Sequence, residues 1–310
     1  MPSTDATSVP ESVGEAEPRV VVIGDALIDE MRDASGSRDF VGGAALNVAV
    51  GLSVLGVPTT LLAMVGDDDS GTVIRDHLAA YGVDLITSDA PLGSARAVSD
   101  RTDGEPRYAF NDAARFRRFP LDGEARRAIE AAPLVVVSCF PFDDTAQTDA
   151  LLEAVSTGER RLIVDPNPRS GMLSDRDAFL ANFVRVAADS LLSKVGDEDA
   201  ALLLGDSVDE FASRLLDAGA ESVLATAGSQ GAAVRLPDGR SVRAGIAHLP
   251  GPVIDTMGAG DATLSATVRD IAQSGLPESD EEWGALLADA MLIAAATCRA
   301  EGALLRVPGA

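Results

Sequence analysis

The sequence predicts an α/β fold in which one layered domain carries a small β flap. Continuous apolar runs, such as residues 19–24 (RVVVIG) and 59–66, are typical of buried parallel strands. Segments with apolar residues at helical spacing alternate with these runs, as expected for helices packed on a parallel sheet. The turn signal Asp103-Gly104 joins two short strand patterns and interrupts the alternation. We therefore expect a hairpin outside the main sheet.

The first half of the chain contains two predicted helices and the flap. The helices cover residues 44–55 and 71–81, and each stops at a glycine, Gly56 or Gly82. The flap is expected from three segments, 30–40, 94–100 and 107–110.

The alternation resumes after the flap and continues almost to the end of the chain. Core strands are expected at residues 134–138, 162–165, 190–194 and 222–226. Helices are expected at residues 145–157, 175–188, 209–219, 259–273 and 283–300. Asp238-Gly239 predicts a second hairpin, with strands at 233–236 and 241–244. No repeat and no long linker divides the chain, so we expect one core over residues 19–308. The acidic, Pro- and Ser-rich residues 1–18 are expected to form a disordered tail.

Charge and composition exclude several classes of function. The chain has 25 basic and 49 acidic residues, for a net charge of −24. Such a surface repels phosphate backbones and anionic lipids, so neither nucleic acid nor a membrane is expected as a partner. Two cysteines, Cys139 and Cys298, provide no disulfide framework and fit a reducing, cytoplasmic location. Lys194 is the one lysine of the chain, so any chemistry that needs a lysine must use it.

The segment 255–261 (DTMGAGD) is the strongest candidate for chemistry. It precedes a predicted helix, and the first N–H groups of a helix lack partners within it. Gly258 and Gly260 carry no Cβ, so a phosphate can come close to those groups. A carboxylate at Asp261 should repel an anion unless it faces another reactant as a general base. Capping of the helix is the alternative, and the spacing leaves both open.

Other candidates follow predicted strands. Asp29 lies five residues after Gly24, where a carboxylate can accept hydrogen bonds from sugar hydroxyls. Residues 226–231 and 165–169 also follow strands, at the edge where open α/β sheets place their ligands. Neither GxxxxGK[ST] nor GxGxxG occurs in the chain, which excludes the two common nucleotide-binding loops.

Two segments together resemble the signatures of the ribokinase/PfkB carbohydrate kinase family. They are residues 42–56 (GGAALNVAVGLSVLG) and 255–266 (DTMGAGDATLSA), in the order and spacing of the family. The similarity runs from about residue 19 to residue 299. It implies a three-layer α/β/α ribokinase-like sandwich with a small β-sheet lid, formed by about 30–41 and 94–112. It also implies transfer of the γ-phosphoryl group of ATP to a sugar hydroxyl, with Mg²⁺.

The resemblance assigns roles to individual residues. Asp261 is similar to the catalytic base of the family, and Gly258, Ala259 and Gly260 are similar to its anion hole. The implied sugar-binding residues are Asp29, Gly42, Gly43, Asn47, Phe110 and Arg169. The implied nucleotide-binding residues are Lys194, Thr226, Gly228, Gly231 and Cys298. A monovalent cation such as K⁺ and a homodimer through the lid are also compatible with the resemblance.

One motif departs from the family pattern. The usual Asn-x-x-Glu becomes Gly196-Asp-Glu-Asp199 in this chain. Asp199 is expected to keep the metal-linked role, directly or through water, but its side chain is shorter. Metal affinity or turnover is then expected to be lower.

The acceptor is predicted from the segments DPNPR, KVGDED and DGEPRYAF, which are most similar to the fructokinase-like branch. Kinases of 2-keto-3-deoxygluconate usually place an arginine after the aromatic lid residues, where this chain has Asn111. Fructose or a similar neutral sugar is therefore expected, unless Arg107, Arg115 or Arg169 pairs with an acid. The alternatives are 2-keto-3-deoxygluconate and ribose. A non-catalytic sugar or nucleotide sensor is the alternative of another class, and such a sensor has no need of Asp261.

Overall fold

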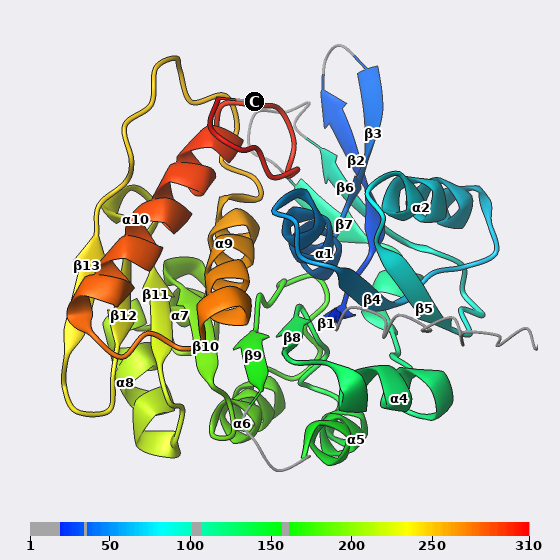
Figure 1. The fold of residues 1–310 in the computed structure, drawn as a ribbon. Coiled ribbons are helices and arrows are strands. Elements are labelled where there is room, and N and C mark those ends of the chain that lie inside the picture. Colours follow the sequence, from blue (N-terminus) through cyan, green and yellow to red (C-terminus); the bar gives the residue numbers. More distant parts are fainter. Residues whose placement is uncertain (1–18, 34–35, 101–106, 157–160, 310) are drawn as a thin grey trace, which may run out of the picture.

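The computed structural model describes residues 19–33, 36–100, 107–156 and 161–309 (Figure 1). The predicted tail and the predicted turn at Asp103-Gly104 lie outside the described residues. Within the described residues, no helix has the length and apolarity that crossing a bilayer requires.

The core of the fold is a nine-stranded, mostly parallel sheet. Only the last two strands, which form the predicted second hairpin, run antiparallel to their neighbours. In spatial order the strands are β13 (Ser241–Ala244), β12 (Ala232–Arg235), β11 (Val223–Thr226), β10 (Leu192–Gly196), β9 (Leu162–Asp165), β8 (Val135–Ser138), β1 (Val20–Gly24), β4 (Thr59–Met64) and β5 (Asp84–Ser88).

Helices cover both faces of this sheet, which confirms the predicted three layers (Figure 1). One face packs against α1 (Ala44–Val54), α2 (Asp69–Ala80), α9 (Ala259–Ser274) and α10 (Asp280–Thr297). The other packs against α4 (Gly123–Ala131), α5 (Thr145–Val155), α6 (Arg176–Ala187), α7 (Asp197–Leu203) and α8 (Val208–Ala218). Side chains of β1 alternate between the two, since Val20 and Val22 join the first core and Val21 and Ile23 the second.

A second, four-stranded sheet is built from the residues predicted for the flap, and we call it the lid sheet. Its strands, in spatial order, are β3 (Gly36–Gly42), β2 (Leu27–Asp33), β6 (Ala95–Asp100) and β7 (Arg107–Phe110). It rises at the upper right of Figure 1, next to α1 and α2. The short helix α3 (Asp112–Arg115) follows β7.

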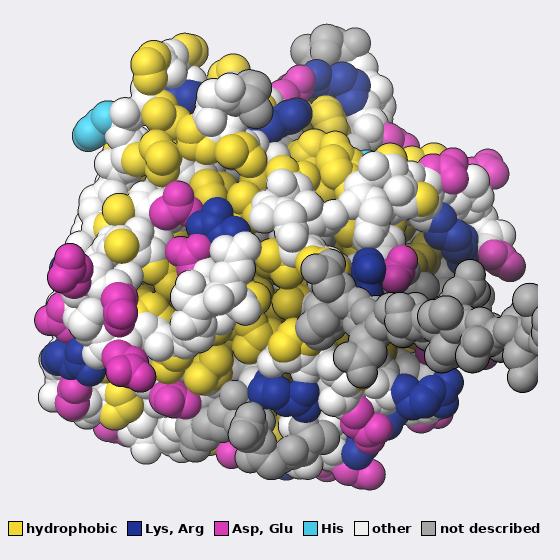
Figure 2. Space-filling model, viewed as in Figure 1, with side chains coloured by type: hydrophobic (Ala, Val, Ile, Leu, Met, Phe, Trp, Pro, Cys, Tyr) yellow, Lys and Arg dark blue, Asp and Glu magenta, His cyan; other side chains and the backbone are white. Residues whose placement is uncertain are grey.

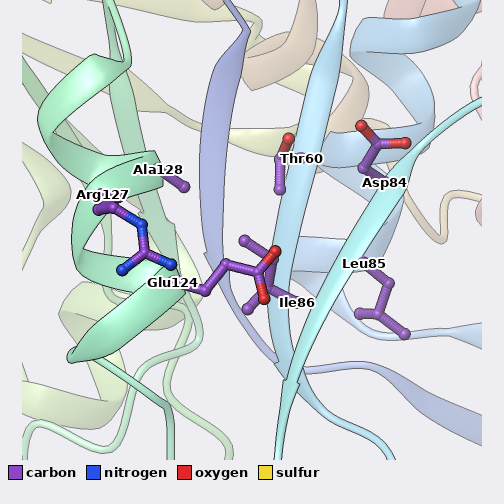
Figure 3. Close-up of a pocket in the computed structure, with 7 residues that line it drawn as sticks. All are labelled: Thr60, Asp84, Leu85, Ile86, Glu124, Arg127 and Ala128. Atoms are coloured by element: carbon purple, nitrogen blue, oxygen red, sulfur yellow. The ribbon is translucent and has the colours of Figure 1, made fainter.

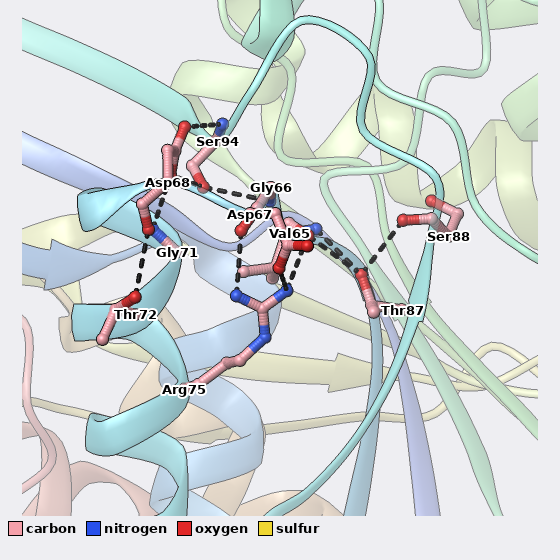
Figure 4. Close-up of polar contacts among 10 residues, drawn as sticks. All are labelled: Val65, Gly66, Asp67, Asp68, Gly71, Thr72, Arg75, Thr87, Ser88 and Ser94. Carbon is pink, nitrogen blue, oxygen red and sulfur yellow. Dashed lines mark hydrogen bonds and ion pairs between the residues drawn. The ribbon is translucent and has the colours of Figure 1, made fainter.

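A polar cluster around Asp68 anchors the lid sheet to the large sheet (Figure 4). The Asp68 carboxylate accepts hydrogen bonds from the Ser94 amide at 2.8 Å and the Ser94 hydroxyl at 2.7 Å. It also caps α2 by accepting from the Gly71 amide at 2.7 Å. Arg75 donates to the Val65 and Gly66 carbonyls at the end of β4. Asp68 therefore joins the start of α2 to the residue before β6, and Arg75 ties α2 to the residues that follow β4.

Most predicted elements are confirmed, with small shifts at their ends. The strand predicted at 190–194 instead spans Leu192–Gly196, because Ser190 closes a turn after α6 by donating its amide to Ala187 O at 3.0 Å. Among the described residues, five elements were not predicted: β5, α3, α4, α7 and the 3-10 helix η1 (Gly228–Gln230).

Candidate active site

The candidate residues meet at the carboxyl ends of the central strands, beside the starts of α1 and α9. Asp165 ends β9, Lys194 lies in β10, and Asp261 lies in the first turn of α9. This is the edge at which an open α/β sheet binds its ligands.

Asp261 is the best-placed proton acceptor. It is 8% exposed, and its Oδ2 accepts a hydrogen bond from Asn47 Nδ2 at 2.9 Å. Burial raises its pKa from 3.8 to about 6; Asp165 adds to the rise, while Asn47, Lys194 and Arg169 oppose it. A carboxylate with this pKa is ionised at neutral pH and holds a transferred proton better than an exposed one does.

The turn before α9 has the shape predicted for an anion site. Gly258 caps the helix with a φ of +78°, a left-handed conformation that favours glycine. A Cβ at this position would also run into the Ala303 carbonyl. Ala259 and Gly260 follow as the first helical residues, whose N–H groups have no partner within the helix, and the Ala259 N–H donates to the Thr256 carbonyl at 3.3 Å. The role of Gly258, Ala259 and Gly260 as an anion hole stays a prediction.

Lys194 supplies a buried positive charge beside this turn. Its Nζ lies 3.1 Å from both carboxylate oxygens of Asp165, and the two side chains are 6% and 0% exposed. Burial alone would lower the pKa of Lys194. The carboxylates of Asp165, Asp199 and Asp261 raise this pKa by more than burial lowers it, so the ammonium stays charged. A Cβ on Gly260 would lie 3.6 Å from Nζ. The ammonium is thus close to where a transferred phosphoryl group would meet the turn.

Asp29 lies in β2 of the lid sheet and faces the same site. Burial raises its pKa to about 6, with further rises from Asp25 and Asp261 and an opposing effect of Arg169. Gly42, paired with Leu27 across the lid sheet, leaves room for this carboxylate, because a Cβ there would run into Asp29 Oδ2. Gly43 is equally constrained, with a φ of +108°.

The remaining sugar-side candidates surround this region. Phe110 packs on Gly171, where a Cβ would come within 2.6 Å of the ring. Arg169 is exposed, and its guanidinium acts electrostatically on Asp25, Asp29 and Asp261. One N–H of the Asn47 amide is bonded to Asp261, and this amide has a second N–H and an oxygen, so a sugar contact of Asn47 stays a prediction.

Asp25 is a site residue that the sequence analysis missed. It is 6% exposed, and its Oδ1 accepts the Ala45 N–H at 3.1 Å. Burial raises its pKa, while the Ala45 hydrogen bond, Arg117 and Arg169 lower it. Its carbonyl also accepts the Leu46 N–H at 3.1 Å. Asp25 therefore holds the start of α1. In the sequence, only its position directly after Gly24, at the end of a predicted strand, indicated that Asp25 belongs to the site.

The nucleotide-side candidates fall into two groups. Thr226 ends β11, and Gly228 and Gly231 follow with φ of +48° and +85°, so this turn needs glycines. Cys298 caps α10, and its carbonyl accepts the N–H of Ile254 at 2.8 Å and that of Asp255 at 3.3 Å. The loop between β13 and α9 exposes Ile246, Val253 and Ile254, and hydrophobic side chains gather over it at the top left of Figure 2.

Asp199 lies in the first turn of α7, where its Oδ2 accepts the Gly196 N–H at 2.7 Å. Burial and Asp165 raise its pKa to about 6, against Lys194, the Gly196 N–H and Arg169. Among the described residues, no three His, Cys, Asp or Glu side chains form a group that could hold a metal.

A surface groove of about 600 Å³ lies elsewhere, between the edge strand β5 and α4 (Figure 3). It is lined by Thr60, Asp84, Leu85, Ile86, Glu124, Arg127 and Ala128. Thr60 and Asp84 are at the amino ends of their strands, whereas the candidate site is at the carboxyl ends. The groove is thus separate from the site.

A proton acceptor beside a helix-start turn and a buried ammonium suits phosphoryl transfer onto an alcohol, which depends on positioning and electrostatics. The class defined by this fold and site is a kinase of small hydroxyl compounds. A family model described as pfkB family carbohydrate kinase matches residues 11–308, and the chain belongs to this family. It is accordingly a sugar kinase.

Relatives of known description agree with this. Fructokinase of Rhizobium leguminosarum bv. trifolii is 32% identical over 198 residues, which cover 58% of this chain and 58% of that protein. Fructokinase of Klebsiella pneumoniae is 28% identical over 301 residues, which cover 94% of this chain and 96% of that protein. The structure of a fructokinase with bound ATP from Xylella fastidiosa superposes with a TM-score of 0.79 at 19% identity, covering 92% of this chain and 94% of that one. The predicted ribokinase-like fold is confirmed.

Proposed function

We propose that the protein transfers the γ-phosphoryl group of ATP to a hydroxyl of a free neutral sugar, fructose or a similar ketose. The hydrogen-bonded, buried Asp261 at the 258–260 turn is the single observation that carries this proposal. Fructokinase relatives support the sugar.

In the proposed reaction each residue has one task. Asp261 takes the proton of the attacking hydroxyl, and Asp29 orients the sugar by accepting hydrogen bonds from its other hydroxyls. The N–H groups of Gly258, Ala259 and Gly260 stabilise the charge that develops on the moving phosphoryl group, with the Lys194 ammonium beside them. Bound ATP with Mg²⁺ supplies the phosphoryl group and shields its charge.

A divalent ion fits the charge of the site. Asp25, Asp29, Asp165, Asp199 and Asp261 carry more negative charge than Lys194 and Arg169 offset, so ATP⁴⁻ alone would be repelled. Asp199 is the residue that would hold the ion, directly or through water. The nucleotide would contact Thr226, Gly228 and Gly231, with its base near Cys298 and the exposed Val253 and Ile254.

The side chain of Asn111 supports a neutral acceptor. Its Oδ1 accepts the N–H groups of Arg96 and Ala114 at 3.0 Å each, and its Nδ2 donates to Ser94 O at 3.0 Å. Arg115 pairs with Asp112 at 3.9 Å. Arg117 is buried and donates to the carbonyls of Cys139 and Ala114. The side chain of Arg107 is not described, so Arg169 is the cation left to recognise an acid among the described side chains of the three arginines named above.

The acceptor is tested by comparing kcat/KM for fructose, ribose and 2-keto-3-deoxygluconate, in the parent and in Arg169→Leu. A charged contact is worth roughly 1.5–3 kcal/mol, so its absence should cost the keto-acid about tenfold or more relative to fructose. A preference for the keto-acid that Arg169→Leu abolishes would replace fructose by an acidic sugar. A cytoplasmic location, activation by K⁺ and a homodimer through the lid sheet remain further parts of the proposal.

A further inference from the structure

Helices α1 and α9 are in close contact at Gly51 and Ser265. A Cβ on Gly51 would lie 2.5 Å from Ser265 Oγ and 3.0 Å from Ser265 Cβ, closer than side-chain atoms pack. The Ser265 hydroxyl donates to the Asp261 carbonyl at 2.8 Å and lies 3.4 Å from the Val48 carbonyl. Gly51 is therefore required for the present spacing of the two helices.

This crossing lies one helical turn from the site. Asn47 precedes Gly51 by four residues, and Asp261 precedes Ser265 by four residues, so each pair lies on one face of its helix. The 2.9 Å hydrogen bond from Asn47 Nδ2 to Asp261 Oδ2 is thus the next contact along the same interface.

We propose, on the basis of the function proposed above, that Asn47 is a positioning residue for Asp261 and that the Gly51–Ser265 crossing sets the distance between them. The Asn47 amide fixes the carboxylate through Oδ2 and leaves Oδ1 for the sugar hydroxyl. This task differs from the sugar contact that the family resemblance implies for Asn47.

The hydrogen bond also has an electrostatic effect. An N–H donated to the ionised form of a carboxylate favours that form, and Asn47 lowers the pKa of Asp261 against the effect of burial. The other charged groups that act on Asp261 or are acted on by it are Asp165 at the end of β9, Arg169 in the following loop, Lys194 in β10 and Asp29 in β2. Replacement of Asn47 leaves all of these groups in the chain. A change in the pKa of Asp261 in the variant should therefore come from the lost Asn47 hydrogen bond.

The first test is the pH dependence of kcat/KM for Asn47→Ala, with the sugar that the parent phosphorylates best. The acid limb reports the essential base of the free enzyme. We expect it to move up by about one pH unit, the size of one lost hydrogen bond to a carboxylate. Asn182→Ala is the matched control, because Asn182 is also a hydrogen-bonded helical amide but donates to Phe142 O and Thr145 Oγ1, outside the site. The proposal is overturned if the acid limb of Asn47→Ala does not move and KM rises equally at every pH. That result would show that Asn47 only contacts the sugar.

The second test leaves every proposed site residue in place. Gly51→Ala should push α1 from α9 and move the acid limb in the same direction as Asn47→Ala. The double variant Gly51→Ala/Ser265→Gly removes both close Ser265 atoms, leaves only the flexible end of Leu305 (Cδ1 at 3.1 Å) against the new Cβ, and should move the limb back toward the parent value. Gly284→Ala is the control, because this helical glycine has room for a Cβ, with Val242 Cγ1 at 4.0 Å. A Gly51→Ala enzyme with a lower melting temperature and an unmoved limb would overturn the crossing as a positioning device.

Failure of the proposed function gives a different result. If Asp261→Asn keeps the parent turnover and pH profile, Asp261 is not the base, and the function proposal fails. If Asp261→Asn is inactive but neither Asn47→Ala nor Gly51→Ala shifts the limb, only the positioning proposal fails.

Discussion

Replacing Asp261 by Asn removes the proposed base with little change of shape. The oxygen of the new amide can still accept the Asn47 N–H that now reaches Oδ2 at 2.9 Å, so the start of α9 should keep its structure. The amide cannot take the hydroxyl proton as a carboxylate does. Loss of a positioned base typically costs ~10²–10⁴ in rate, and we expect kcat to fall by this amount. Affinity for ATP should hold or rise, because a negative charge near the phosphates is removed.

The same substitution should change stability with a defined dependence on pH. Burial raises the pKa of Asp261 from 3.8 to about 6. Between about pH 4 and pH 6 the folded protein therefore keeps a proton on Asp261 that the unfolded chain has released. The parent therefore loses stability as pH rises from about 4 to about 6, and the loss persists above pH 6. A rise of about two pH units corresponds to on the order of 3 kcal/mol. Asp261→Asn lacks this loss. The free energy of unfolding of the variant, relative to that of the parent, should therefore be higher at pH 8 than at pH 4.

Two assays on the same purified variant test this reasoning. Coupled ADP release gives kcat, and urea unfolding at pH 4 and pH 8 gives the free energy of unfolding. A variant that retains more than roughly a tenth of the parent kcat refutes Asp261 as a general base. A stability difference between variant and parent that is equal at both pH values refutes the burial argument. A capping role alone would leave kcat near normal, since Asn caps about as well as Asp.

Three further substitutions or measurements probe the surroundings of the site. Asp68→Ala removes the α2 cap and the two hydrogen bonds from Ser94, the residue before β6 of the lid sheet. We expect a loss of about 1–2 kcal/mol in urea unfolding, and no loss would contradict the anchoring. Lys194→Met leaves Asp165 buried without its partner and should destabilise by about 3–5 kcal/mol. Adding Asp165→Asn should restore part of that stability but not turnover, whereas restored turnover would remove Lys194 from the mechanism. Hydrogen exchange of 36–42 and 95–100 should slow when sugar is added, and unchanged exchange with every active sugar would argue against closure of the lid sheet.

Periodicity in the sequence was enough to predict the layered fold. The strands of the parallel sheet are short continuous apolar runs, which is why β1, β4, β8 and β9 could be placed closely. The edge strand β5 (DLITS) has polar and apolar residues mixed, and α7 is short and opens with three acidic residues. Neither has a strong periodic pattern, so neither was predicted.

The contacts within the site could not be read from the sequence. Asn47 and Asp261 are 214 positions apart, and only the crossing of α1 and α9 brings them together. Asp25 was missed because a single carboxylate after a strand has no sequence pattern of its own, and its bond to the Ala45 N–H exists only in the fold. Motif resemblance named Asn47 and Asn111 by position, whereas the structure shows which atoms their amides already contact.

The central claim is that this protein phosphorylates a free sugar with ATP, and product analysis tests it most directly. The purified enzyme is incubated with ATP, Mg²⁺ and one of fructose, ribose, glucose, 2-keto-3-deoxygluconate or a phosphosugar, and the products are followed by ³¹P NMR. We expect a new sugar phosphate signal that grows with ADP, is strongest with fructose, and is absent without Mg²⁺ or with Asp261→Asn. Binding of sugar or ATP with no ADP and no sugar phosphate from any acceptor would contradict the claim and favour a non-catalytic sensor.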